Sequence, residues 1–330
     1  MIAKMEHLKT TTYIILLLLV FNNITAQQNP EQAFTEREIV LRTSSGGEIF
    51  GTLTVPESTK PVPLVLIIAG SGPTDRDCNS PLGVRSNAYK MLAEGFAKNS
   101  IATLRYDKRG IAKSAAAMTG EIDLRFDNYI NDAIDWVAYL KQDKRFSDIM
   151  ILGHSEGSLI GMAAAQKSDV SKYISLAGAG KPIDVIIKEQ MNGQTLPKEL
   201  IDESDRILDS LKEGRTVSKV NLMLLSLYRP SVQPYMISWL KYDPTEEIKK
   251  LKIPVLIVQG TTDMQITVED AKLLSSARPD AKLLIIENMN HIMKEADGDR
   301  QKNLATYSNP DLPLKPELLQ GLLEFIKAKR

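Results

Sequence analysis

D-I-M-I-L-G-H-S-E-G-S-L-I-G, from Asp148 to Gly161, is the stretch of this chain that decides its fold. Ile149 to Leu152 form a short all-apolar run, which is typical of a strand buried on both faces of a parallel sheet. The next five residues, G-H-S-E-G, make a G-x-S-x-G pattern centred on Ser155, and Ser158 to Gln166 is a small-residue run typical of a helix. A strand, a sharp turn and a helix together predict that the Ser155 hydroxyl is exposed at the sheet edge.

Histidine is scarce in this chain, which limits the side chains that could activate a serine. A serine hydroxyl is a weak nucleophile unless a base takes its proton, and imidazole is the usual base near neutral pH. His7 lies in an amino-terminal segment that we expect to be removed, and the ring of His154 should point away from the Ser155 hydroxyl. His291 follows a strand-like run, Ala281 to Ile286, and is the predicted base; a surface histidine is the alternative.

A carboxylate is needed to orient such a base and to stabilise its protonated form. Pro254 to Gly260 is another buried-strand run, and Asp263 follows it on the next loop. Asp270, inside an expected helix from Val268 to Ala277, and Asp280, before a strand, are the rivals, and both are expected to be solvated. Asp263 is therefore the predicted third member.

A glycine-rich turn follows the expected strand from Leu64 to Ala69. Such a turn can direct backbone N–H groups at a negative charge that develops on oxygen during a reaction. We expect one N–H from Ser71 and a second from Glu156, the residue after the candidate nucleophile. An ordinary strand-to-loop turn is the alternative.

The remaining pattern predicts an α/β protein with a mostly parallel sheet and helices on both faces. Glu38 to Arg42 and Glu48 to Val55 alternate around a Ser-Gly turn and predict a hairpin, and strands then alternate with helices. The predicted order is a 27–35 linker, a core over 36–180, a helical cap over 181–242, and a second core segment over 243–330.

The expected cap contains no strand-like run, and it separates two core strands. An insertion of this kind can cover the carboxyl edge of a sheet as a lid. Most of its apolar residues should form its own core, and four of them are expected to line a pocket: Met223, Tyr228, Met236 and Trp239.

Residues 1–26 have the layout of a secretory signal peptide. Lys4 and Lys9 precede an apolar run from Tyr13 to Phe21, and a small-residue cleavage site ends at Ala26. The run is far shorter than the ~20 residues of a membrane span. We therefore expect export to the periplasm or the medium without a stable membrane anchor after cleavage; an uncleaved anchor is the alternative.

Composition excludes several other classes of function. Lys and Arg together number 41, as do Asp and Glu, so nothing in the charge favours nucleic acid or an anionic membrane. Cys78 is the single cysteine, which excludes an intramolecular disulfide, and no histidine or cysteine cluster suggests a metal.

Four motifs resemble a known family. They are G-S-G-P-T-D-R-D from Gly70 to Asp77, R-Y-D-K-R-G from Arg105 to Gly110, the G-H-S-E-G turn, and G-T-T-D ending at Asp263. Over residues 36–330 the chain resembles α/β-hydrolases of the serine-aminopeptidase-like lipase and esterase group, and in particular bacterial carboxylesterases with a GSGPxDRD loop. Asn79 and the I-M-K segment after His291 depart from the family pattern, and the latter implies a different pocket rim.

The resemblance implies a Ser155, Asp263, His291 triad, in the family's chain order, with the Ser71 and Glu156 N–H groups as oxyanion donors. The implied reaction is hydrolysis of a small-molecule ester through an acyl-enzyme, without metal or cofactor. The short cap predicts a preference for short to medium acyl chains. An aminopeptidase or amidase with the same machinery, and a non-catalytic binding protein, are the alternatives.

Overall fold

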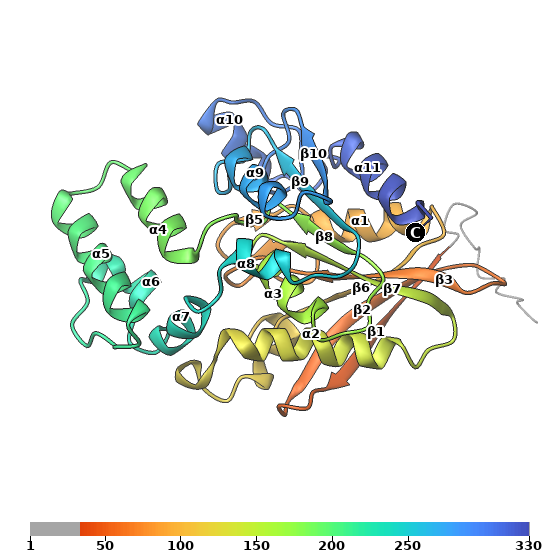
Figure 1. Ribbon diagram of the computed structural model, residues 1–330, viewed down its shortest axis with the longest axis horizontal. Coiled ribbons are helices and arrows are strands. Elements are labelled where there is room, and N and C mark those ends of the chain that lie inside the picture. The colour runs from red at the N-terminus through yellow and green to blue at the C-terminus, as the bar shows by residue number, and fades with distance from the viewer. Residues whose placement is uncertain (1–33, 330) are drawn as a thin grey trace, which may run out of the picture. The chain divides into compact units, whose positions relative to one another are not determined.

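One eight-stranded sheet lies at the centre of the protein (Figure 1). The computed structural model describes residues 34–329, so the predicted signal peptide and most of the 27–35 linker lie outside the described residues. The strands lie side by side in the order β1-β2-β6-β3-β7-β8-β9-β10. Their bounds are β1 Phe34–Arg42, β2 Glu48–Pro56, β3 Val62–Ile68, β6 Ala102–Tyr106, β7 Phe146–His154, β8 Tyr173–Leu176, β9 Val255–Gly260 and β10 Lys282–Ile286.

The sheet is antiparallel at its amino-terminal end and parallel over the rest. β1 and β2 pair antiparallel, and the turn between them contains Gly46 and Gly47, with φ angles of 83° and 89°. Glycine adopts positive φ without steric cost, so the predicted hairpin is confirmed. β2 is also antiparallel to β6, whereas the neighbouring pairs from β6 through to β10 are parallel. A separate two-stranded ribbon pairs β4, Asn79–Ser80, with β5, Val84–Arg85.

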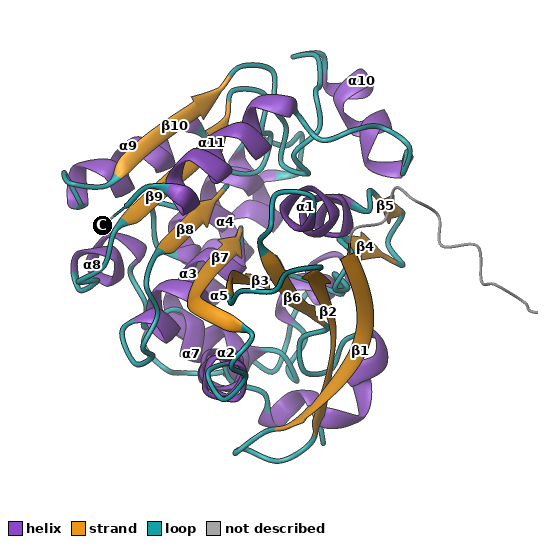
Figure 2. Ribbon diagram, turned by 90° about the vertical axis from the view of Figure 1, so that its right-hand side faces the viewer, coloured by secondary structure: helices purple, strands orange, loops and turns teal. Residues whose placement is uncertain are grey.

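Helices cover both faces of the sheet, as its sequence predicts. In β3, Leu64, Leu66 and Ile68 contribute to one hydrophobic cluster, and Val65 and Ile67 contribute to the other. Two helices, α1 (Ala88–Ala97) and α11 (Pro316–Lys327), pack on the second cluster. The other face is covered by α2 (Phe126–Leu140), α3 (Glu156–Ala165), α8 (Pro244–Lys249) and α9 (Val268–Ala277), as Figure 2 shows. The mostly parallel, doubly covered sheet is thus confirmed.

The chain between β8 and β9 is helical. Its helices are α4 (Ile183–Asn192), α5 (Lys198–Lys212), α6 (Leu225–Tyr228) after a short 3-10 turn at Leu222–Leu224, and α7 (Gln233–Trp239). Figure 1 shows α4 to α7 projecting to one side of the sheet. α8 was not expected, because proline usually ends a helix and Pro244 was interpreted in that way. Pro244 lies in the first turn of α8, where the backbone N–H that proline lacks would have no partner within the helix. The interpretation of residues 181–242 as a cap stays a prediction.

A short helix, α10 (Arg300–Ala305), follows the loop that carries His291. Within residues 34–329, no helix combines the length and the apolar character that crossing a bilayer requires.

Candidate active site

Ser155 lies on a strained turn between β7 and α3. Its φ and ψ angles are 54° and −122°, a conformation that a non-glycine residue adopts only when its surroundings impose it. A Cβ added to Gly153 would lie 2.1 Å from the Gly157 carbonyl oxygen, and one on Gly157 would lie 2.3 Å from that of Ile68. Only glycine therefore permits the helix to pass this close to the strands.

Asp263 and His291 form a buried hydrogen-bonded pair. His291 Nδ1 lies 2.8 Å from Asp263 Oδ2, and Gln259 Nε2 donates to the same oxygen at 3.0 Å. The other carboxylate oxygen accepts the N–H groups of Gln265 and Ile266, at 2.8 and 3.1 Å. Burial acts to raise the pKa of Asp263, but His291 and these donors outweigh it and hold that pKa below its usual value. An ionised Asp263 keeps the proton on Nδ1 and leaves Nε2 as an acceptor.

Ser155 and His291 line the same cavity. It has a volume of about 280 Å³, and Gly70, Ser71 and Gln265 also contribute to its wall. A second cavity, of about 120 Å³, shares Ser155, Ser71 and Gln265 with the first. Its further lining is mostly apolar: Leu159, Ala179, Ile183, Ile186, Trp239, Pro244 and Ile266, together with Glu156, Lys181 and Gln190. Ser155 therefore lies where a substrate could extend in two directions.

Two backbone N–H groups are available beside Ser155. A Cβ added to Gly70 would lie 3.2 Å from the Ser155 Cβ, which brings the loop after β3 next to the turn. Within residues 34–329, no hydrogen bond uses the N–H of Ser71 or that of Glu156, and both residues line the smaller cavity. Glu156 opens α3, so the helix dipole adds to the positive potential at this point.

The loop after β3 is anchored by two arginine–aspartate pairs that join the first two motifs. Arg76 donates to Asp107 through its backbone N–H at 2.8 Å, and through Nε and Nη2 at 3.0 and 2.7 Å. In the second pair the arginine comes from the other motif: Arg105 Nε donates to Asp77 at 2.7 Å. This reciprocal pairing was not predicted from the sequence, where the opposite charges within the two motifs were the available signal.

His154 joins the loop that carries Ser71 to the loop that carries His291. The Tyr89 hydroxyl accepts the Gly70 N–H at 3.1 Å, and it lies 2.7 Å from His154 Nδ1. His154 Nε2 lies 2.8 Å from the carbonyl oxygen of His291. Burial, followed by the neighbouring His291, lowers the pKa of His154 to about 3, so its ring is neutral. Tyr89 then donates to Nδ1, and Nε2–H donates to the carbonyl. This role of His154 was not predicted from the sequence.

The four expected pocket residues lie in different environments. Trp239 lines the smaller cavity beside Ser155. The other three belong to the wall of neither cavity. Met223 is 66% exposed, whereas Met236 is buried and Tyr228 is fully buried, with its hydroxyl 2.7 Å from Ser204 Oγ. Their apolar character in the sequence did not distinguish the surface or the interior of the insertion from the wall of the site.

One further expectation is corrected. Asp270 is not solvated: it is buried at the start of α9, where its side chain accepts hydrogen bonds from Thr267 and from the Gly180 N–H. Asp280, by contrast, is largely exposed and pairs with Arg278. Cys78, the single cysteine, is 3% exposed and lines the larger cavity.

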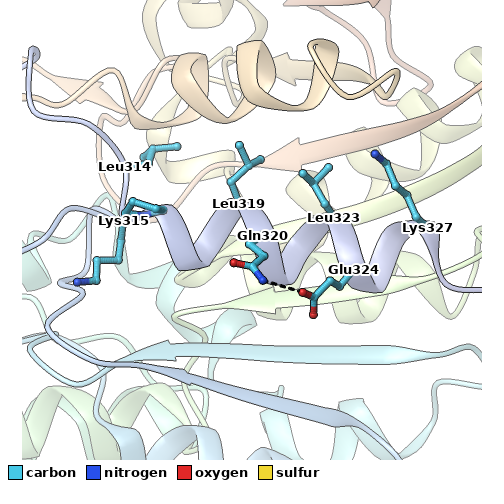
Figure 3. Close-up of a pocket in the computed structure, with 8 residues that line it drawn as sticks. Leu314, Lys315, Leu319, Gln320, Leu323, Glu324 and Lys327 are labelled. Carbon is cyan, nitrogen blue, oxygen red and sulfur yellow. Dashed lines mark hydrogen bonds between the residues drawn. The ribbon is translucent and has the colours of Figure 1, made fainter.

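A hollow of about 500 Å³ along α11 is separate from this site (Figure 3). Leu319 and Leu323 lie along one side of the helix, and Gln320 Nε2 donates to Glu324 at 3.0 Å. It shares no lining residue with the two cavities at Ser155. In the described part of the chain, no group of three or more His, Cys, Asp or Glu side chains could hold a metal ion.

The sequence profile of the serine aminopeptidase family, S33, matches residues 82–297. The chain belongs to the S33 family. The match includes Ser155, Asp263 and His291, and it begins after the Gly70 to Asp77 loop. The resemblance to α/β-hydrolases of this group is thereby confirmed.

One relative of this S33 chain is named as an esterase. Esterase EstD of Thermotoga maritima is 27% identical over 280 residues, which are 81% of this chain and 62% of EstD. The chain thus spans less than two thirds of the length of this relative.

Two solved structures share the fold. Est1E of Butyrivibrio proteoclasticus, with ferulic acid bound, has a TM-score of 0.58 at 18% identity, over 88% of this chain and all of Est1E. The Pyrococcus furiosus esterase Pf2001 has a TM-score of 0.57 at 14% identity, over 89% of this chain and 91% of its own. The S33 chain therefore has the α/β-hydrolase fold.

Proposed function

We propose that this protein is an exported serine hydrolase that cleaves carboxylic esters with short to medium acyl chains. The observation that carries the proposal is the Asp263–His291 pair, whose imidazole shares a cavity with the hydroxyl of the strained Ser155. Membership of the S33 family and the similarity to EstD support a hydrolase that acts on esters.

In the proposed mechanism, Ser155 Oγ attacks the ester carbonyl carbon while His291 Nε2 takes its proton. The N–H groups of Ser71 and Glu156 stabilise the oxyanion of the tetrahedral intermediate. His291 then gives the proton to the departing alcohol, and a water molecule cleaves the acyl-enzyme by the same steps. Asp263 holds the imidazole in the required tautomer throughout.

The two cavities suggest how an ester would be divided between them. We assign the acyl group to the smaller, mostly apolar cavity, because each buried methylene contributes about 0.8 kcal/mol to binding. The alcohol then occupies the larger cavity, whose wall includes Ser71, Thr74, Ser80 and Tyr307. A volume of about 120 Å³ favours short acyl groups.

A panel of chromogenic esters, compared with aminoacyl amides of the same size, tests the proposal directly. We expect ester hydrolysis that is lost in Ser155→Ala, and covalent labelling of Ser155 by a fluorophosphonate probe. Faster cleavage of the amides would establish the aminopeptidase alternative instead. Absence of both labelling and turnover would indicate a binding protein.

A further inference from the structure

Glu156 takes part in a buried ion pair, and it lines the smaller cavity together with Ser155 and Ser71. Its carboxylate is 4% exposed, and its own backbone N–H is one of the two proposed donors. At the low effective dielectric of a protein interior, such a charge would repel an oxyanion developing nearby. A glutamate at this position therefore requires compensation if the site is to stabilise negative charge.

Lys108 supplies a compensating positive charge. Its Nζ donates to Glu156 Oε2, and the Lys108 side chain is 2% exposed. The same ammonium group lies 4.7 Å from the ring centroid of Tyr129, a cation–π contact that holds it in place. Lys108 follows β6 in the second motif, so the core, and not the insertion, provides this charge.

The other carboxylate oxygen of Glu156 is bound by the helical insertion. Tyr235, on α7, donates its hydroxyl to Glu156 Oε1. Burial raises the pKa of Tyr235 well above its usual value, so the hydroxyl remains a proton donor. The Tyr235 ring contacts Tyr129 edge-on, with centroids 5.8 Å apart. Both oxygens of Glu156 are therefore held by buried partners from two different parts of the fold.

We propose that Lys108 is a positioning residue that neutralises Glu156 and thereby permits the adjacent N–H groups to stabilise an oxyanion, with Tyr235 linking the helical insertion to the same carboxylate. The inference rests on the proposed function, because it presumes that Ser155 is the nucleophile. If the ion pair between Lys108 and Glu156 were purely structural, loss of either partner should slow the reaction of Ser155 equally. If Lys108 compensates the charge of Glu156, loss of Lys108 should slow the reaction more than loss of Glu156, because only loss of the cation leaves an uncompensated negative charge near the oxyanion.

The rate of Ser155 labelling by a fluorophosphonate measures this effect without reference to the natural substrate. In that reaction the Ser155 Oγ–P bond forms, fluoride leaves, and the serine proton passes to His291. We expect Lys108→Met to slow labelling about 100-fold, comparable to loss of an oxyanion donor, and Glu156→Gln to slow it about 10-fold at most. Lys108→Met combined with Glu156→Gln should recover to the rate of Glu156→Gln alone.

Asp132→Asn is the matched control. It removes the charge from a neighbouring buried pair, in which Asp132 accepts from Arg109 Nε at 3.1 Å, and Asp132 lines neither cavity at Ser155. It should lower the melting temperature without slowing labelling. Equal slowing in Lys108→Met and Glu156→Gln, or no recovery in the double variant, would overturn the proposal.

Two further measurements keep the test decisive. If Lys108→Met does not fold, the double variant decides alone: labelling at the rate of Glu156→Gln supports charge compensation, and labelling about 100-fold slower rejects it. If the wild type is labelled but does not hydrolyse esters, the proposed substrate class is wrong. The role of Lys108 can still be tested in that case, because the labelling rate does not depend on the substrate.

Discussion

Two histidines of this protein show how environment decides the role of one residue type. His154 is fully enclosed, and its lowered pKa makes it a neutral group that joins Tyr89 to the His291 loop. His291 has an ionised carboxylate on one ring nitrogen and a cavity shared with Ser155. The same imidazole thus serves as a fixed hydrogen-bonding link in one case and as the proposed base in the other.

Substitutions in the proposed triad should affect turnover far more than stability. We expect Ser155→Ala and His291→Ala each to lower kcat by about 10⁵-fold or more, because neither nucleophile nor base has a substitute. Asp263→Asn should cost about 10⁴-fold, since an amide favours the wrong imidazole tautomer. Steady-state kinetics with a chromogenic ester measures all three, and a near-normal rate in His291→Ala would disprove the assignment of the base.

Lys294 gives a prediction about stability and pH. It is fully buried, and burial lowers its pKa from 10.5 to about 8. Between these pH values the unfolded chain binds a proton at Lys294 that the folded chain has lost, so the contribution of Lys294 to the free energy of unfolding should rise with pH. One proton changes it by at most about 1.4 kcal/mol per pH unit.

Lys294→Met should remove this rise, because methionine has no proton to lose. Urea unfolding at several pH values between about 8 and 10.5 measures it. Lys282, on the exposed start of β10, provides the matched control, and Lys282→Met should keep the wild-type slope. Equal slopes in wild type and Lys294→Met would show that Lys294 does not titrate in this range.

At the scale of elements, α7 connects the helical insertion to the nucleophile turn. Trp239 stacks on Phe126 of α2, with ring centroids 5.5 Å apart and planes 6° from parallel. On the same helix, Tyr235 reaches Glu156 at the start of α3. One short helix therefore contributes both to the wall of the smaller cavity and to the charge cluster beside Ser155.

Trp239→Ala should move the preference of the enzyme toward longer acyl chains. Loss of the indole enlarges the smaller cavity, and each added methylene that it then buries contributes about 0.8 kcal/mol, or about fourfold in kcat/KM. The measurement is kcat/KM for a series of esters from acetate to palmitate. Leu222→Ala, at a residue that is 83% exposed, should leave the optimum in place. An unchanged optimum in Trp239→Ala would exclude this cavity as the acyl site.

At the scale of the whole molecule, the parallel sheet brings distant segments together. β7, β8, β9 and β10 are neighbours in the sheet, so the loops that follow β7, β9 and β10 leave from the same edge. Those three loops carry Ser155, Asp263 and His291. The insertion after β8 leaves from the same edge, which places its helices beside the proposed reaction site.

Export gives the prediction for the whole chain. The short apolar run before Gln27 predicts cleavage by a signal peptidase, because it is too short to span a bilayer as a helix. Mass spectrometry of periplasmic or secreted protein should find a chain that begins at or near Gln27. A full-length chain retained in the cytoplasm would contradict this expectation, and one retained in the membrane would favour the uncleaved anchor.

The sequence alone determined the sheet, most of its helices and the three candidate triad residues. It could do so because these features are local: apolar runs mark buried strands, and short loops after parallel strands carry their side chains to one edge. The helix that begins at Pro244 was missed, since proline permits both a break and a first turn.

Only the tertiary structure decided which buried side chains serve the site. The periodic pattern of apolar residues in a sequence indicates which side chains are buried, but it does not identify the side chains that they contact. Tyr235 and Glu156 are 79 positions apart, and Arg76 and Asp107 are 31 apart, so no local pattern could pair them. Tyr228 and Trp239 have the same apolar aromatic character in sequence, yet one faces Ser204 inside the insertion and the other lines the cavity at Ser155. That difference arises from the packing of whole helices against the sheet.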